Sequence, residues 1–308
     1  MVSNMLKIIQ NKYKQINNNE PITLTIGNFD GFHLGHRLLV KTTKSFTDTK
    51  SALMTFNPPA NRYFSLTKFL TLSTINDKQL IANQLGLDLL IEIVFDNDFA
   101  KLSKEEFINF LKKIKVKRLV VGSDFKFGAH GLGTIDDLLK EFEVIVVSDV
   151  YYRQIKVSTS YIKELITTTQ FEIVKELLTR EYQISGMVIN GKKLGRTIGF
   201  PTANLDTNGY YLPKNGVYLV EVVINGCQYF GVASLGYNPT ISSDTTQKLE
   251  VYIFNFSQNI YKEVIKLTFI EYLRPEIKFE SLQQLKNQIQ IDVNNAQNLL
   301  KLKEIVLK

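Results

Sequence analysis

The stretch TIGNFDGFHLGH, residues 25–36, combines the end of a strand, a glycine-broken turn and the start of a helix. Before it, residues 22–26 alternate apolar side chains with threonines, which is the period of a strand. Asn28 to Gly31 interrupt that alternation, and residues 34–40 then read as the start of a helix. The stretch therefore predicts a strand–turn–helix unit.

The same order of strand and helix recurs along the first half of the chain. Ser103 and Glu106 form a capping box before a helix, and Ser158 or Ser160 can cap another. The further strands are expected at 51–56, 87–95, 118–122 and 144–147, and the helices at 105–114, 136–142 and 161–166. Alternation of this kind predicts an α/β domain, a Rossmann-like parallel sheet with helices on both faces, over residues 1–183.

After residue 184 the pattern changes to short strands and turns, with no obvious helix up to about residue 269. Asn225-Gly226 lies between two strand-like runs and predicts a hairpin. We therefore expect an antiparallel β-barrel in residues 184–308, closed by a terminal helix that Ser281 caps. One face of that helix, packing across the barrel, is expected to carry Leu282, Leu285, Ile289, Val293 and Ala296.

Composition sets the broad class of the protein. The 308 residues are 44% hydrophobic and 22% charged, as in globular proteins, and carry a net charge of +7 that favours phosphorylated or polyanionic ligands. The densest basic run, residues 112–118, also reads as a solvated helix end. A single cysteine, Cys227, and the lack of a signal peptide or membrane-length apolar run predict a soluble, cytoplasmic protein without a membrane partner.

Two of the three histidines, His33 and His36, stand three residues apart at the start of the predicted helix. Phosphate binds well at a helix N-terminus after a glycine turn, and two imidazoles there could stabilise charge that develops on it. The alternative is a pair of solvent-exposed histidines. Metal ligation is disfavoured, because no nearby side chains complete a ligand set.

A second glycine-rich segment, GKKLGRTIGFPTANL at residues 191–205, is basic and compatible with phosphate, but is not a Walker A motif. An ordinary barrel loop is the alternative. Thr202 and Asn204 supply neutral oxygens two residues apart, which suits Mg²⁺ carried in by ATP. Glu250 lies inside a predicted strand, where an acidic residue is most often simply exposed.

Several segments resemble one family in order along nearly the whole chain. GNFDGFHLGH resembles the nucleotide-binding signature of the bacterial bifunctional riboflavin kinase/FAD synthetases. The other segments that resemble this family's adenylyltransferase half are DFAKLSKEEF, VVGSDFKFGAHGLG and VSTSYIKELI, and those that resemble its kinase half are SGMVINGKKLGRTIGFPTANL, ASLGYNPT, LEVYIFNF and LRPEIKF.

The resemblance implies two reactions in one chain. The N-terminal domain would convert FMN and ATP to FAD and pyrophosphate, with His33 and His36 stabilising the α-phosphate. Asp124, Phe125 and Phe127 would help to hold the flavin, although both phenylalanines read equally well as core. The residues implied to bind ATP in this domain are Gly27, Asn28, Phe29, Asp30, Gly31, Gly35, Ser158, Thr159, Ser160 and Lys163.

The barrel would convert riboflavin and ATP to FMN and ADP. Glu250 would be the general base and Thr202 and Asn204 the Mg²⁺ ligands, while Arg274 would contact the flavin unless it is only solvated. Riboflavin, FMN and FAD would be substrates and products rather than prosthetic groups. The residues implied to bind ATP here are Lys193, Gly195, Arg196, Gly199 and Pro201.

The chain departs from the family pattern at three positions. Pro59 stands where the family usually has a histidine, Lys163 replaces an arginine and so loses the bidentate fork, and Tyr252 replaces a common histidine. The alternative function is thus a riboflavin kinase with a weakened or inactive adenylyltransferase domain. A nucleic-acid-binding protein is disfavoured, because the sequence has no concentrated basic arm. A non-catalytic flavin carrier is disfavoured, because both phosphate-compatible loops are present. The oligomeric state stays open.

Overall fold

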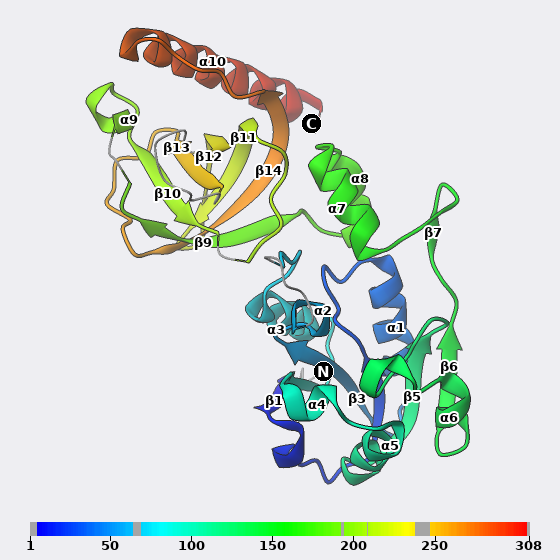
Figure 1. The fold of residues 1–308 in the computed structure, drawn as a ribbon. Coiled ribbons are helices and arrows are strands. Elements are labelled where there is room, and N and C mark those ends of the chain that lie inside the picture. Colours follow the sequence, from blue (N-terminus) through cyan, green and yellow to red (C-terminus); the bar gives the residue numbers. More distant parts are fainter. Residues whose placement is uncertain (1–4, 64–68, 192–193, 208, 238–246, 307–308) are drawn as a thin grey trace. The chain divides into compact units, whose positions relative to one another are not determined.

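The computed structural model describes residues 5–63, 69–191, 194–207, 209–237 and 247–306 (Figure 1). The chain divides into two compact units. The first comprises Met1–Ile162 with Leu177–Thr179, and the second comprises Lys163–Glu176 with Arg180–Lys308. The boundary predicted at residue 183 stays a prediction.

The first unit contains the predicted parallel sheet. It has six strands in the spatial order β1-β4-β3-β2-β5-β6, and its edge strand β1 was not predicted. A separate two-stranded hairpin, β7-β8, follows it. The strands are β1 (Lys7–Asn11), β2 (Ile22–Ile26), β3 (Lys50–Asn57), β4 (Leu89–Val94), β5 (Val116–Gly122), β6 (Glu143–Val147), β7 (Tyr151–Tyr152) and β8 (Ile155–Lys156).

Helices connect these strands, and the last two of them, α7 and α8, are divided between the units. The helices are α1 (Leu34–Lys44), α2 (Ala60–Tyr63), α3 (Ile75–Gln84), α4 (Asn97–Ala100), α5 (Lys104–Lys113), α6 (Ile135–Leu139), α7 (Thr159–Thr167) and α8 (Phe171–Leu178), with 3₁₀ turns at Tyr13–Gln15 and Ala129–Gly131. The predicted capping box of Ser103 and Glu106 is present at α5, and Ser158 rather than Ser160 caps α7. The helix expected at 136–142 ends earlier, at Leu139.

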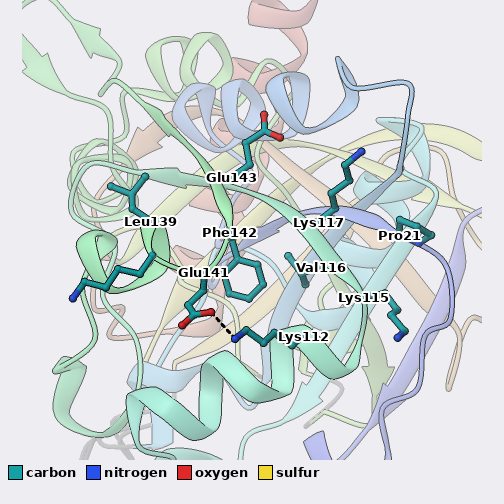
Figure 2. Close-up of a pocket in the computed structure, with 10 residues that line it drawn as sticks. Pro21, Lys112, Lys115, Val116, Lys117, Leu139, Glu141, Phe142 and Glu143 are labelled. Carbon is teal, nitrogen blue, oxygen red and sulfur yellow. Dashed lines mark hydrogen bonds and ion pairs between the residues drawn. The ribbon is translucent and has the colours of Figure 1, made fainter.

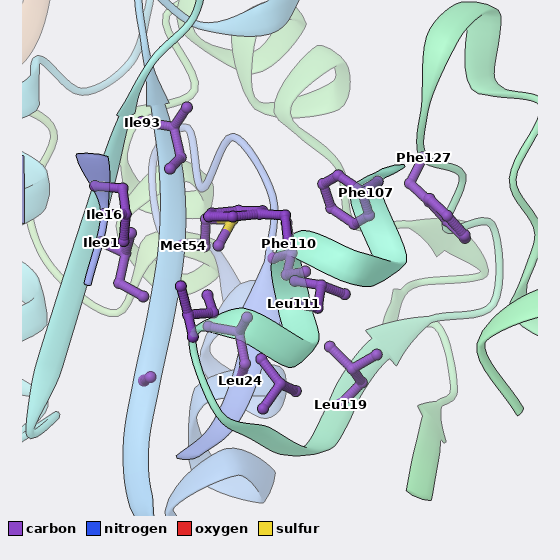
Figure 3. Close-up of a cluster of buried hydrophobic side chains, with 14 of the residues drawn as sticks. Ile16, Leu24, Met54, Ile91, Ile93, Phe107, Phe110, Leu111, Leu119 and Phe127 are labelled. Carbon is purple, nitrogen blue, oxygen red and sulfur yellow. The ribbon is translucent and has the colours of Figure 1, made fainter. Parts of the chain in front are cut away.

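Helices cover both faces of the sheet, because the alternating side chains of its strands divide between two cores. Leu24 of β2 and Ile91 of β4 pack with Phe107, Phe110 and Leu111 of α5 on one face (Figure 3). The core on the other face is formed by Leu6, Phe29, Phe32, Val40, Leu53, Ile81, Ala82, Leu87 and Leu90, which include residues of α1 and α3. A sheet covered on both sides explains why all five residues of β2 are buried, its threonines included.

The chain order places a switch point between β2 and β5. From β2 the chain moves outward through β3 and β4, and it then returns to build β5 and β6 on the other side. In open α/β sheets, ligands bind at the carboxyl ends of the strands beside such a point. The turn after β2 and the loop after β5 therefore mark the edge where a site is expected.

The second unit contains the predicted antiparallel barrel, which is closed and has the strand order β10-β13-β12-β11-β14-β9. Asn225 and Gly226 form the predicted hairpin turn, with φ of 49° and 82°. The strands are β9 (Gln183–Ile189), β10 (Thr202–Asp206), β11 (Gly216–Ile224), β12 (Cys227–Gly236), β13 (Lys248–Ile253) and β14 (Val264–Arg274). A four-residue helix, α9 (Leu194–Thr197), interrupts a segment in which the sequence suggested no helix.

The terminal helix α10 (Leu282–Val306) packs on β12 and β14 of the barrel. Ser281 caps it through the Gln284 amide, as expected. Val293 and Ala296 are buried in a core with barrel residues, and Ile289 packs against them. Leu282 is 54% exposed, so its assignment to the buried face was wrong; it is the first residue of the helix, before the turns that meet the barrel.

Candidate active sites

The turn between β2 and α1 has a backbone that ordinary residues rarely adopt. Gly31 has φ of +84°, and a Cβ at this position would lie 2.9 Å from Cδ1 of Leu72. Phe29 and Phe32 also have positive φ, of 45° and 50°, although neither is glycine. Both phenylalanine side chains are fully buried against each other, so their packing offsets the strain of the turn.

Asp30 ties this turn to a distant segment. Its buried carboxylate oxygen Oδ1 accepts hydrogen bonds from the backbone amides of Leu72, at 2.7 Å, and Ser73, at 3.0 Å. The Gly31 amide donates to Ser73 Oγ at 3.1 Å. Asp30 therefore holds the turn to the segment at Leu72 and Ser73, and the part in ATP binding that the resemblance implies for it stays a prediction.

The turn presents the two histidines side by side. His33 is the N-cap residue of α1 and His36 lies one turn further on. Their rings stack with centroids 3.7 Å apart and an interplanar angle of 23°. Nδ1 of both rings is buried without a hydrogen-bond partner among the described residues. No described protein group at that atom fixes the tautomer, so either nitrogen of each ring can carry the proton.

Burial keeps both imidazoles neutral. It lowers the pKa of His33 to about 4, with a smaller contribution from the ammonium of Lys156. The pKa of His36 is held well below its ordinary value by burial first, then by His33 and Lys78. Near pH 7 the pair thus offers hydrogen-bond donors without carrying charge of its own.

The start of α7 meets the same turn. Thr159 Oγ1 donates to the Asp30 carbonyl at 3.1 Å, and Ser158 Oγ accepts from the Tyr161 amide at 3.2 Å. The structure thus brings together two segments that lie far apart in the sequence. Ser160 is exposed, and Lys163 belongs to the second unit, where its ammonium lies 5.3 Å from the ring centroid of Tyr211.

A cavity of about 1270 Å³ opens along this edge of the sheet. Single drug-sized ligands usually occupy about 300–1000 Å³, so two substrates can share it. The predicted residues that line the cavity are Gly27, Asn28, Phe29, His33, Gly35, His36, Asp124, Phe125, Phe127 and Ser158. The third histidine, His130, also lines it, from the loop after β5.

One part of the cavity wall is aromatic. Phe125 is half-buried and Phe127 is 5% exposed, with its ring stacked 6.2 Å from that of Phe125. Phe127 also packs 5.0 Å from the ring of Phe107 in the core beside α5, so it serves both as core and as cavity wall. Sequence reasoning missed the other aromatic side chains of this wall, which are Phe56, Tyr63, Phe95, Phe99 and Phe107.

Sequence reasoning also missed Lys156, which lines the cavity from β8. Its ammonium pairs with Asp124 at 3.1 Å and with Asp149 at 2.9 Å. The one sequence signal was its position immediately before the hydroxyl-rich start of α7. Asp124 is exposed, so this pair is open to solvent and to ligand.

A second depression, of about 650 Å³, lies at the opposite edge of the sheet (Figure 2). Its wall includes Val116 and Glu143, which begin β5 and β6, and Lys112, whose ammonium pairs with Glu141 at 2.5 Å. None of the predicted site residues line it. The amino ends of parallel strands are not where such sheets bind ligands, so this depression is set apart from the site.

In the second unit, Glu250 and Thr202 meet across two neighbouring strands. Thr202 Oγ1 donates to Glu250 Oε2 at 3.3 Å, and Asn204 is the cross-strand partner of Glu250. A Cβ on Gly191 would lie 2.2 Å from Nδ2 of Asn204, so a bare backbone is needed where that carboxamide lies. The barrel therefore gathers one carboxylate and two neutral oxygens.

Thr202 and Glu250 line a cavity of about 200 Å³ in this unit, together with Gly195 and Arg274. A Cβ on Gly195 would lie 2.2 Å from the Phe200 carbonyl, so the glycine allows this loop to close on itself. Arg196, Gly199 and Pro201 are exposed in the same segment. Lys193 lies outside the described residues.

Arg274, at the end of β14, is held by the terminal helix. Its Nε donates to Asp292 Oδ1 at 2.8 Å and its Nη2 to Oδ2 at 2.7 Å. Asp292 of α10 is 3% exposed. The predicted flavin contact is thus a bidentate partner of a buried carboxylate at the cavity wall.

Known families match both halves of the chain. The profile of the FAD synthetase family matches residues 15–161, and that of the riboflavin kinase family matches residues 178–300. Proteins called bifunctional riboflavin kinase/FMN adenylyltransferase are similar over most of their length. The Listeria monocytogenes protein is 36% identical, covering 87% of this chain and 89% of that one. The Bacillus subtilis protein is 35% identical, covering 89% and 90%.

The fold also matches a solved structure. A crystal structure described as that of a macrolide-efflux protein from Streptococcus pneumoniae is 30% identical, with a TM-score of 0.83. It covers 96% of this chain and 99% of that one. Within the described residues, no helix is long and apolar enough to cross a membrane.

Proposed function

The chain belongs to the family of bifunctional riboflavin kinases/FMN adenylyltransferases, and we propose which of its residues carry the two reactions. It phosphorylates riboflavin to FMN and adenylylates FMN to FAD. The relatives named for both activities favour this function over a kinase with an inactive first domain.

The first unit is proposed to transfer the adenylyl group at the His33–His36 pair. The FMN phosphate attacks the α-phosphorus of ATP, pyrophosphate leaves, and negative charge grows on the α-phosphoryl oxygens. Such reactions depend mainly on positioning and charge stabilisation. Two neutral imidazoles at a helix N-terminus can donate to those oxygens without first losing a hydration shell.

The rest of the cavity supplies two further roles. Ser158 and Thr159 at the start of α7 are proposed to contact the triphosphate. Thr159 supports this role, because it donates a hydrogen bond to the Asp30 carbonyl in the turn that carries the histidines. The aromatic wall around Phe125 is proposed to hold the isoalloxazine ring. Lys156, poised between two carboxylates, is a candidate partner for a phosphate group.

The second unit is proposed to be the kinase, with Glu250 as general base. A carboxylate there can accept the proton of the ribityl 5′-hydroxyl as that oxygen attacks the γ-phosphorus of ATP. Thr202 and Asn204 carry oxygen donors of the kind that Mg²⁺ accepts, and the bare Gly191 leaves room for the Asn204 carboxamide. When bound with ATP, Mg²⁺ would neutralise phosphate charge at these residues.

The observation that carries the proposal is the stacked, neutral His33–His36 pair within a cavity large enough for two substrates. The test is a chromatographic time course of the purified chain with riboflavin, ATP and Mg²⁺. We expect FMN to appear first and then to be converted to FAD. FMN that accumulates without FAD would overturn the adenylyltransferase assignment and direct attention to Pro59 and Lys163. Formation of neither product would overturn the kinase assignment.

The setting of the enzyme is also proposed. The free Cys227 is exposed at the hairpin start of β12, which fits a reducing compartment such as the cytoplasm. The partners are proposed to be riboflavin, FMN and ATP, with no nucleic acid or membrane among them. Fractionation of cells that express the chain would place it.

A further inference from the structure

A buried lysine is connected to the turn between β2 and α1, residues 27–33, which is called the nucleotide turn below. Lys78 of α3 is 1% exposed, and its ammonium donates to Thr55 Oγ1 at 3.4 Å. Thr55 Oγ1 in turn donates to the Asn28 carbonyl at 3.2 Å. A short chain of hydrogen bonds thus connects Lys78 to the backbone of the turn that presents the histidines.

Two buried carboxylates act on this ammonium electrostatically, and both raise its pKa. One is Asp30 of the turn, and the other is Glu92 of β4, the cross-strand neighbour of Thr55. Glu92 is fully buried, and its Oε1 accepts a hydrogen bond from Gln79 Nε2 at 2.7 Å. Charges at this depth are costly unless they are paired, so the three groups depend on one another.

The cluster also reaches His36 electrostatically. Burial lowers the pKa of Lys78 to about 8, while Asp30 and Glu92 oppose that change and keep the ammonium charged near pH 7. The positive charge contributes, after burial and His33, to the low pKa of His36. Burial raises the pKa of Glu92, against the hydrogen bond from Gln79 and the charge of Lys78.

A purely structural role explains this arrangement poorly. Well-packed apolar residues of similar volume are often as stable as a buried ion pair, or more stable. This cluster instead places a buried cation one hydroxyl group away from the backbone of the Asn28–Asp30 turn. The Thr55 hydroxyl connects Lys78 to the turn through hydrogen bonds, and the Asp30 carboxylate acts on Lys78 electrostatically.

We propose that Lys78 is a positioning residue of the adenylyltransferase site, which acts through Thr55 and Asp30 to hold the nucleotide turn and His36 in their reactive arrangement. The inference rests on the proposed roles of His33 and His36. It predicts that removing the ammonium impairs the chemical step of FAD formation more than substrate binding, because the turn loses its support without losing a ligand contact.

The test compares Lys78→Met, which keeps the length of the side chain, with Lys78→Arg, which keeps the charge. Thr55→Val and Thr55→Ser form a second, milder pair, because valine keeps the shape and serine keeps the hydroxyl. Lys41→Met, an exposed lysine of α1, is the matched control. The kinase rate of each sample reports the amount of enzyme, because that site lies in the other unit, and circular dichroism reports whether the first unit is folded.

We expect kcat for FAD formation to fall about tenfold or more in Lys78→Met and Thr55→Val, with KM for FMN changed by less than about threefold. Lys78→Arg and Thr55→Ser should recover much of the rate. The inference is overturned if both Lys78→Met and Thr55→Val keep kcat within about twofold of the unaltered chain. It is also overturned if the conservative variants lose as much as the disruptive ones.

NMR of the histidine side chains measures the titration midpoint of His36, which tests the loss of the Lys78 charge apart from the loss of packing. The chain has only three histidines, so their ¹⁵N imidazole signals can be assigned with single variants. In Lys78→Met the titration midpoint of His36 should rise, because a positive charge that lowers its pKa is gone. An unmoved His36 midpoint would overturn the inference. His36→Asn tests the proposed role of His36 separately from the inference about Lys78. If this variant still forms FAD, the role of His36 is refuted, whatever the result for Lys78→Met.

Discussion

The imidazole rings of His33 and His36 stack with their centroids 3.7 Å apart at the start of α1. This arrangement disfavours the protonated form of both imidazoles. Burial lowers the pKa of each ring, and His33 lowers the pKa of His36 further. The pair is therefore suited to donate hydrogen bonds to a charged phosphate. It also makes the chain sensitive to acid.

The first prediction concerns stability against pH. Both imidazoles have a lower pKa in the folded chain than the ordinary 6.5, so the unfolded chain binds more protons below pH 6.5. The free energy of unfolding should be highest above pH 6.5 and fall as the pH drops toward 4, by on the order of 3 kcal/mol for His33. Urea titrations at several pH values measure this.

A matched variant separates this effect from the titration of carboxylates. His33→Asn should lose part of the pH dependence between 6.5 and 4, while His130→Asn, at an exposed position, should keep it. An identical slope in His33→Asn and in the unaltered chain would contradict the assignment.

The second prediction concerns the adenylyl step. Replacing His36 with alanine removes a donor to the α-phosphate, and should lower kcat for FAD formation about 100- to 1000-fold. The rate of FMN formation should be unaffected, because the kinase site lies in the other unit. Both rates can be followed in one chromatographic assay, and a His36→Ala enzyme that makes FAD normally would refute the role.

The third prediction concerns the kinase step. Glu250→Gln keeps the shape of the side chain and its contact with Thr202 but removes the base, so FMN formation should fall by about 100-fold or more. FMN supplied directly should still be converted to FAD. Glu263→Gln, on an exposed carboxylate that pairs with Asn225, is the control. Full kinase activity in Glu250→Gln would exclude Glu250 as the base.

The fourth prediction concerns the pair of Arg274 and Asp292. Asp292→Asn leaves a partly buried guanidinium without its bidentate partner, and should lower the free energy of unfolding by about 3 kcal/mol. Asp98→Asn, which breaks an exposed ion pair with Lys14, should lower the free energy of unfolding much less, because solvent screens that pair. Urea denaturation of both variants makes the comparison, and equal losses would show that the buried pair adds nothing special.

Much of the architecture follows from local patterns that the sequence displays. Alternating apolar residues in β2, the Ser103–Glu106 capping box and the Asn225-Gly226 turn each act over a few residues, and all were found as predicted. The face of α10 was right at Val293 and Ala296 but wrong at Leu282, because periodicity assigns a face without showing where contact with the barrel begins.

The hydrogen bonds and ion pairs that hold the two sites in place could not be predicted from the sequence. Asp30 bonds to backbone amides 42 and 43 residues away, and Lys78 reaches Thr55 across 23 residues. Arg274 was predicted to contact the flavin, with a solvated strand end as the alternative, and nothing in the sequence indicated its pairing with Asp292 of α10. Such pairings depend on which elements the fold places side by side, and no local spacing encodes them.

The sequence by itself determined the alternation of strands and helices in the first half, the change to short strands after it and the phosphate-compatible turn, because hydrophobic period, capping and glycine placement act locally. Only the tertiary structure decided that His33 and His36 are stacked and neutral, and that a buried cation lies behind them. The physical reason is that burial and charge pairing are properties of the packed interior, where residues distant in sequence set one another's protonation.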